Sequence, residues 1–97
     1  MLGYVIGHVD ITDPEGFEEY SSQVPPTIEQ YGGRFITRGG RAEKLEGSIE
    51  PWRLVILEFP SYEQAKAWYQ SDEYQPLIEM RQRTSIGDLL LVEGYEG

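Results

Sequence analysis

The stretch from Trp52 to Arg83 constrains the fold more than any other part of this sequence. It opens with an aliphatic run, LVIL, which is too short for a helix and is typical of a strand. Pro60 ends that strand, because proline has no backbone N–H to donate. Ser61 then begins a helix, and Gln64 completes a capping box three residues later. A strand that leads directly into an amphipathic helix indicates an open sheet on which the helix packs.

Periodicity along the rest of the chain supplies the other elements of one domain, residues 1–97. The predicted strands are 2–11, 34–38, 53–59 and 89–93, with 41–46 as a continuation of the second. The predicted helices are one between Pro14 and Gly32, which Pro25-Pro26 either kinks or divides, one after Ser61, and one over 73–83. The order β-α-β-β-α-β predicts a ferredoxin-like α+β sandwich, a four-stranded antiparallel sheet with its helices on one face.

Both faces of the predicted strands are apolar, although helices can cover only one of them. Leu54 and Ile56 lie on one face of their strand, and Val55 and Leu57 lie on the other. An open apolar sheet face is rare on a monomer and indicates an interaction surface. We therefore predict a homodimer that associates through the sheet faces.

The charge of the chain excludes some partners. Seventeen acidic residues against eight basic ones give a net charge of −9, which repels nucleic acid and anionic membranes. No apolar run approaches the roughly 18 residues of a membrane helix, and the first residues lack a signal-peptide pattern. With no cysteine, one histidine and no metal-binding motif, we predict no metal and no cofactor. The predicted location is the cytoplasm.

Several blocks of this sequence occur together in one known family. The phrases GYVIGHVDITDPEGFEEY, YGGRFITRGG, EKLEG, LVILEFPSYEQAKAWYQSDEYQPLIEMR and LVEG, in this order, resemble the domain of unknown function 1330 family. The resemblance covers nearly the whole chain, and it implies a dimeric α+β barrel in which two ferredoxin-like units pack sheet against sheet. It implies no particular chemistry. The chain departs from the family pattern at Pro25-Pro26 and at Thr84-Ser85, both at predicted helix ends.

His8 is the only histidine, and it lies on the first predicted strand, on the same face as Tyr4, Ile6 and Asp10. If this face lines an apolar cavity, His8 is a candidate general base. The alternative, which we favour, is a hydrogen-bonded histidine with a structural role.

Glu58 ends the apolar face of its strand and needs a partner if it is buried. Arg34 and Arg38, expected to share one face with Ile36, are the candidate partners. The functional interpretation is a pocket in which an arginine binds a ligand carboxylate. The simpler interpretation is a cross-strand ion pair at the rim of the sheet.

Three aromatic residues, Trp68, Tyr69 and Tyr74, surround the helix break at Ser71-Asp72. At helical spacing they are most often core, but buried tyrosine hydroxyls need partners and can line a cleft between helix and sheet. Arg81, on the face of Leu77 and Ile78, either closes the same cleft or forms a salt bridge near Glu79. The predicted ligand pocket therefore has a charged floor from His8, Arg34 or Arg38, and Glu58, and a lid from residues 68–74.

Two classes of function remain open on these residues. One is an enzyme that transforms a small organic molecule in the cleft between sheet and helices, which rests on analogy with the fold. The other is a dimeric module without catalytic activity that binds a small organic acid or another protein. Convergence of His8, an arginine and Glu58 in one cavity would favour the first class.

Overall fold

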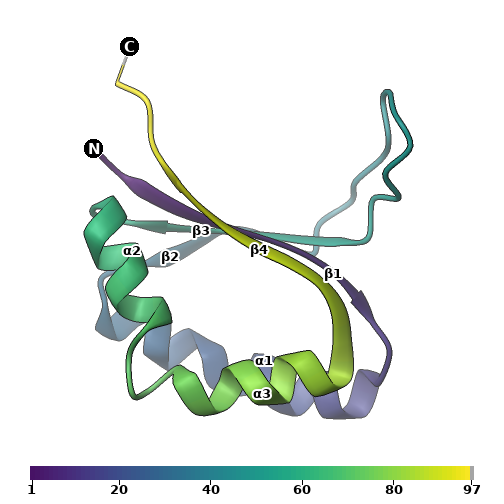
Figure 1. Ribbon diagram of the computed structural model, residues 1–97, viewed down its shortest axis with the longest axis horizontal. Helices are drawn as coiled ribbons and strands as arrows, with labels where there is room; N and C mark the ends of the chain where they lie inside the picture. The colour runs from purple at the N-terminus through teal and green to yellow at the C-terminus, as the bar shows by residue number, and fades with distance from the viewer. Residues whose placement is uncertain (97) are drawn as a thin grey trace.

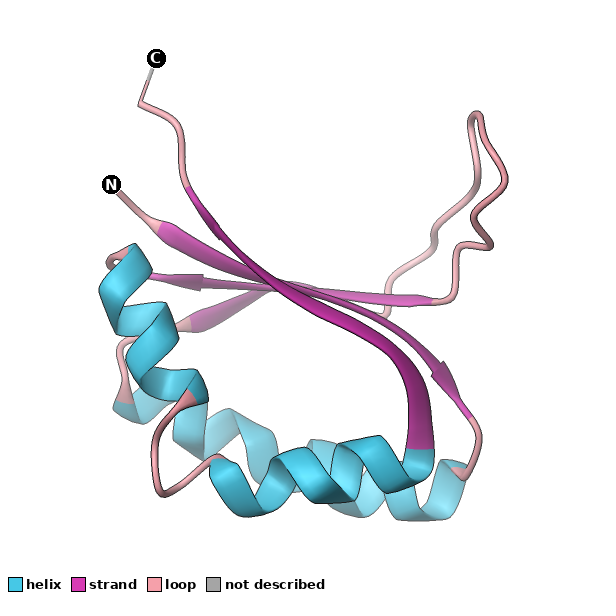
Figure 2. Ribbon diagram, in the orientation of Figure 1, coloured by secondary structure: helices cyan, strands magenta, loops and turns pink. Residues whose placement is uncertain are grey.

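The structure, a computed structural model, describes residues 1–96 and places every helix on one face of an antiparallel sheet (Figure 1). The strands are β1 (Gly3–Ile11), β2 (Arg34–Arg38), β3 (Arg53–Phe59) and β4 (Ser85–Glu93). The helices are α1 (Pro14–Gln30), α2 (Tyr62–Tyr69) and α3 (Gln75–Thr84), and Figure 2 shows them beneath the sheet. The strand order β2-β3-β1-β4 confirms the predicted ferredoxin-like α+β fold.

Alternation along the central strand β1 decides which side chains enter the core. Odd-numbered positions 3–9 are buried against the helices, whereas even-numbered positions 4–8 are half buried on the opposite face. Val5 lies opposite Leu57 of β3 and Leu91 of β4, so three neighbouring strands present one aliphatic layer to the helices. The face of each β1 residue is as the sequence predicts.

Helix α1 is continuous although it contains two prolines. Asp13 caps its first turn by accepting a hydrogen bond from the backbone N–H of Gly16, at 3.3 Å. Pro25 and Pro26 lie inside the helix, so of the two predicted alternatives the single helix is found. Proline cannot donate to the carbonyl four residues earlier, and the carbonyl of Ser21 therefore lacks its usual helical partner.

Ser61 caps the start of α2 by accepting from the N–H of Gln64 at 3.0 Å, as predicted.

The link between α2 and α3 is held by a buried serine. The Ser71 hydroxyl donates to the Trp68 carbonyl at 2.7 Å and accepts from the Tyr74 N–H at 3.1 Å. Helix α3 begins at Gln75, two residues later than predicted, because this turn precedes it.

Two boundaries of the sheet differ from the sequence-based prediction. Residues 41–46 do not continue β2, because β3 begins only at Arg53 and leaves them no strand to pair with. Residues 39–52 instead form an exposed arm that projects from the sheet on the side away from the helices (Figure 1). Strand β4 begins at Ser85 rather than Leu89, since it pairs with β1 along its whole length.

The face of the sheet away from the helices is left uncovered by the described residues. Leu90 and Val92 of β4 are 63% and 44% exposed there, and Ile6 and Ile56 lie half buried between them and β2. The prediction that both faces of the sheet are apolar is confirmed.

A close approach between β1 and the start of α2 predicts a stability effect. A Cβ atom on Gly3 would lie 2.5 Å from the Ser61 carbonyl oxygen, which already accepts from the N–H of Ala65. We expect Gly3→Ala to lower the free energy of unfolding by ~2 kcal/mol, measured by urea denaturation. Gly40→Ala is the control, because its nearest neighbour is the Thr37 side-chain oxygen at 3.3 Å on an exposed loop. Equal midpoints for the two variants would contradict this packing.

Candidate functional site

His8 lies on the uncovered face of the sheet, where it holds the base of the arm. Its Nε2 atom is 2.8 Å from the Glu50 carbonyl oxygen and 3.2 Å from the Trp52 backbone nitrogen. The imidazole stacks on the Trp52 ring with centroids 5.1 Å apart. This is the hydrogen-bonded structural role that the sequence analysis favoured, and it places His8 outside the cavity described below.

Glu58 forms the cross-strand ion pair that was the simpler interpretation. Its Oε1 is 2.9 Å from Nε of Arg34, whose side chain is 70% exposed. The Tyr4 hydroxyl donates a weaker hydrogen bond to the other carboxylate oxygen at 3.4 Å. Because Glu58 is opposite Tyr4 on β1, this pair also lies on the uncovered face.

The expectation that Arg34 and Arg38 share one face of the sheet is wrong. The pairing of β2 with β3 shifts register between Phe35 and Thr37, which is the signature of a β-bulge. Without a bulge, residues 34 and 38 would point the same way; the extra residue sends their side chains to opposite faces. Arg34 therefore meets Glu58, whereas Arg38 turns toward the helices.

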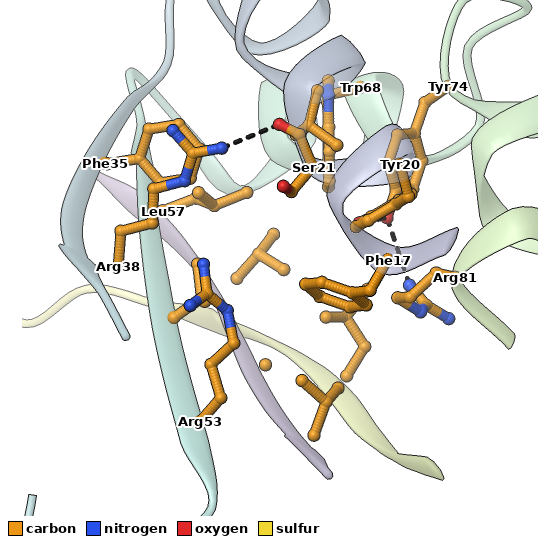
Figure 3. A pocket seen from close by; sticks show the side chains of 16 residues that line it. Phe17, Tyr20, Ser21, Phe35, Arg38, Arg53, Leu57, Trp68, Tyr74 and Arg81 are labelled. Carbon is orange, nitrogen blue, oxygen red and sulfur yellow. Dashed lines mark hydrogen bonds between the residues drawn. The ribbon is translucent and has the colours of Figure 1, made fainter. Parts of the chain in front are cut away.

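The cavity between the sheet and the helices is the candidate functional site (Figure 3). Aliphatic residues of β1, β3 and β4 form its floor, and Phe17, Trp68 and Phe35 add aromatic walls. Its volume is about 60 Å³, room for a few water molecules, and about 540 Å³ when the space at its open mouth is counted. Its polar side chains are the following: Tyr20, Ser21, Arg38, Arg53, Tyr74 and Arg81.

Two arginines enter this cavity from the strand side, as Figure 3 shows. Arg38 donates to the Ser21 carbonyl at 2.7 Å, the carbonyl that Pro25 leaves without a helical donor, and its guanidinium lies 4.4 Å from the centroid of the Phe35 ring. Arg53 lies on the helix face, opposite Val9, with its guanidinium 5.6 Å from the Phe17 ring centroid. Its Nε is buried and has no hydrogen-bond partner within the described chain.

The cations of the cavity lack acidic partners. Of the ion pairs found within residues 1–96, none involves Arg38, Arg53 or Arg81. Burial, and then the charge of the neighbouring Arg38, lower the pKa of Arg53 from its usual value. A chain with net charge −9 thus keeps uncompensated positive charge at one partly buried place. Such a cluster favours an anion.

Two buried phenols face each other on the helix side of the cavity. The Tyr20 and Tyr74 oxygens are 2.7 Å apart, and Nη1 of Arg81 donates to the Tyr74 oxygen at 3.1 Å. Burial raises the pKa of Tyr20, and the adjacent Tyr74 raises it further. Burial also raises the pKa of Tyr74, although its bonds with Tyr20 and Arg81 act in the opposite direction. Both phenols are therefore neutral at physiological pH.

The predicted site residues divide between the two faces of the sheet. Arg38, Trp68 and Tyr74 line the cavity, and Arg81 closes it as expected, whereas His8, Arg34 and Glu58 lie on the uncovered face. Tyr69 is more than a third exposed and lies outside the cavity.

Arg53 and Tyr20 line the cavity, although neither was predicted to belong to the site. The alternation along β3 places Leu57, Val55 and Arg53 on one face. This alternation could have predicted that Arg53 faces the helices with the two aliphatic residues. Tyr20 was counted only as part of the apolar stripe of α1, although its hydroxyl distinguishes it from its neighbours there.

Residues 1–96 offer neither a metal site nor a membrane-spanning helix. Residues 1–96 contain no group of three histidine, cysteine or carboxylate side chains placed to hold a metal ion. None of the helices in this part of the chain is both long and apolar enough to cross a membrane.

The fold and cavity define a ferredoxin-like α+β domain of the kind seen in other small proteins. A protein of unknown function from Rhodopseudomonas palustris is 19% identical with a TM-score of 0.77, covering 99% of this chain and 84% of its own. A conserved protein from Methanosarcina mazei Go1 is 16% identical with a TM-score of 0.56, covering 95% and 91%. A proposed antibiotic biosynthesis monooxygenase from Nitrosomonas europaea is 20% identical with a TM-score of 0.54, covering 99% and 96%. At these identities the likeness concerns the fold alone.

The family is shown by the sequence itself. Residues 2–95 match the model of the domain of unknown function DUF1330, and the chain belongs to this family. The resemblance seen in the sequence blocks is thereby confirmed. A search of curated proteins finds no match.

The buried phenols predict how stability depends on alkaline pH. In the unfolded chain a tyrosine ionises near pH 10, whereas folding holds the pKa of Tyr20 and Tyr74 above that value. Their contribution to stability is complete below pH 10 and is lost as the pH rises toward the folded-state pKa, at ~1.4 kcal/mol per pH unit for each phenol. Urea denaturation between pH 9 and 11 should show this fall.

Tyr20→Phe should make the fall shallower, because one of the two phenols is removed. Tyr95→Phe is the control, since Tyr95 is 93% exposed and should leave the pH dependence unchanged. The same slope in wild type and Tyr20→Phe would contradict the burial of this hydroxyl.

Proposed function

We propose that this protein binds a small carboxylic acid with an apolar body in the cavity between sheet and helices. The carboxylate lies between Arg38 and Arg53, and the apolar body lies on the aliphatic floor. The observation that carries the proposal is the buried Nε of Arg53, a charged donor left without an acceptor. Leaving such a group unpaired is costly, so a ligand carboxylate that pairs with it gains that free energy.

The geometry of guanidinium groups suits this ligand. A carboxylate accepts two parallel hydrogen bonds from one arginine, and a second arginine beside it adds positive charge. Arg38 is already oriented by the Ser21 carbonyl and the Phe35 ring, which reduces the entropy lost on binding. The small enclosed volume favours an acid of few carbon atoms, with any larger group at the mouth.

The chemistry of the lining favours binding over acid–base catalysis. The residues of the cavity include no histidine, aspartate, glutamate or cysteine. His8 and Glu58 do not join an arginine there, which was the arrangement expected of a catalytic site. One structure of similar fold is a proposed antibiotic biosynthesis monooxygenase, and this supports a small-molecule site on the fold.

Removing the unpaired arginine should separate binding from stability. We expect Arg53→Met to weaken pentanoate binding at least about tenfold, since hydrogen bonds to a charged group contribute about 1.5–3 kcal/mol. The melting temperature of the free protein should stay the same or rise, because a partly buried charge beside Arg38 is replaced by an apolar side chain. Isothermal titration calorimetry and thermal denaturation measure the two effects.

Arg34→Met is the matched control, because it makes the same substitution on the uncovered face. It should leave pentanoate binding unchanged. Pentanamide, which has the same shape without charge, should bind much more weakly to wild type. Equal pentanoate affinity in wild type and Arg53→Met would overturn the proposed site.

We propose in addition that two copies associate through the uncovered sheet face, as the family resemblance implies. Aliphatic side chains from β1, β3 and β4 form a continuous surface there, and burying it removes apolar area from water. The Arg34–Glu58 pair lies toward one edge of this surface. The arm of residues 39–52 rises from the opposite end of β3, next to Arg53 (Figure 1). A second copy offers the same aliphatic surface, as a two-fold interface requires.

The dimer can be tested with neighbouring residues on opposite faces of β3. Ile56 lies opposite Ile6 on the uncovered face, whereas Leu57 is 4% exposed beneath the helices. Light scattering of the wild type should give twice the 11.1 kDa chain mass. Ile56→Asp should give a folded monomer and Leu57→Asp an unfolded chain, since each buries an unpaired charge in a different layer. A wild-type monomer would overturn the proposed association.

A further inference from the structure

The hydrogen bonds of the two phenols in the cavity have a favoured order of donation. Arg81 is always protonated, so its Nη1–H donates to the Tyr74 oxygen. Tyr74 is fully buried, and the Tyr20 oxygen at 2.7 Å is the acceptor within reach of its own proton. In either direction one O–H of the pair lacks an acceptor among the described residues, and this costs less on Tyr20, which is 9% exposed, than on Tyr74, which is 0% exposed. The favoured order of donation is therefore Arg81 to Tyr74 to Tyr20.

This order leaves one donor unused. In this order the Tyr20 oxygen accepts from Tyr74, and the Tyr20 O–H is left without an acceptor among the described residues. Tyr20 comes from α1 and lines the same cavity as Arg53, which approaches from β3 on the opposite side (Figure 3). Hydrogen bonds in a chain strengthen one another, and a guanidinium at its start makes the last O–H a better donor. The cavity thus presents arginines on one side and a polarised phenol on the other.

We infer that the ligand is an oxo acid, with its carboxylate at Arg38 and Arg53 and its carbonyl oxygen accepting from Tyr20. This inference rests on the proposed binding of a carboxylic acid and adds the second polar group that the cavity recognises. A carbonyl oxygen is an acceptor without a proton of its own, which matches the free O–H that this order of donation leaves on Tyr20. Tyr20 contacts the ligand, and Tyr74 and Arg81 position its hydroxyl.

The test compares acids that differ only in one oxo group. Pentanoate, 2-oxopentanoate and 4-oxopentanoate have the same carbon chain. The two oxo acids place the carbonyl oxygen at different distances from the carboxylate, and therefore from the Tyr20 hydroxyl. We expect one oxo acid to bind wild type about threefold to tenfold more tightly than pentanoate, the gain of one additional hydrogen bond. In Tyr20→Phe this preference should disappear, so that pentanoate and the two oxo acids bind this variant with affinities within about twofold of one another.

An infrared measurement reports the hydrogen bond directly. The carbonyl stretch of the ¹³C-labelled oxo acid should move to lower frequency on binding to wild type, and should not move on binding to Tyr20→Phe. Tyr74→Phe keeps the Tyr20 hydroxyl but removes the group that donates to it, so the shift should be smaller than in wild type. Tyr95→Phe, on the exposed chain end, should behave as wild type. A purely structural role for the phenols would leave the carbonyl frequency equal in all four proteins.

The outcomes separate this inference from the proposed function. If pentanoate binds through Arg53 but the oxo acids gain nothing from Tyr20, the oxo-acid inference is overturned and acid binding stands. If no acid binds, both the proposed acid binding and the oxo-acid inference are overturned. An NMR titration with 2-pentanone, a neutral ketone, then shows whether Tyr20 contacts a carbonyl in the absence of any carboxylate. The result tells whether the contact that fails is the one with the arginines or the one with Tyr20.

Discussion

The cavity depends on the absence of a side chain at the centre of the sheet. Gly7 of β1 lies between Val55 of β3 and Leu89 of β4, on the face that the helices cover. A Cβ atom there would lie 3.0 Å from the Leu89 side chain, so a larger residue at this position would crowd Leu89 and fill part of the cavity that both residues line. The helix side of this cavity is formed by aromatic side chains from α1, from α2 and from Tyr74 in the turn before α3. The molecule keeps a dense core around an unfilled centre, and this centre is where polar groups can meet a ligand.

Two local irregularities bring Arg38 to this centre. The bulge in β2 turns its side chain to the helix face, and Pro25 leaves the Ser21 carbonyl free to accept from it. Each irregularity weakens the regular hydrogen bonding of its own element, and together they hold a cation over an apolar floor. Pro25 therefore has a consequence at the site as well as in the helix.

The two faces of the sheet differ in how their charged groups are paired. The helix face combines Arg38 and Arg53 with the Tyr20–Tyr74 pair, and we assign the proposed ligand recognition to it. The opposite face pairs Arg34 with Glu58 and holds the arm through His8, and its aliphatic surface suits the proposed association with another copy of the chain. The arginines of the cavity therefore lie on the face that the proposed association leaves free.

The sequence by itself determined the fold, because the alternation along β1 and β3, the caps at Asp13 and Ser61 and the position of Pro60 are local properties. It grouped His8 with Tyr4 and Glu58 with Leu54 correctly, but the face that each group occupies depends on where the helices pack. The sequence could not determine that Arg34 and Arg38 separate, because a bulge depends on how β2 aligns with β3. Nor could it show that Tyr20 meets Tyr74 across 54 positions, or that the Nε of Arg53 is left without a partner. These facts follow from packing between distant segments, which only the tertiary structure decides.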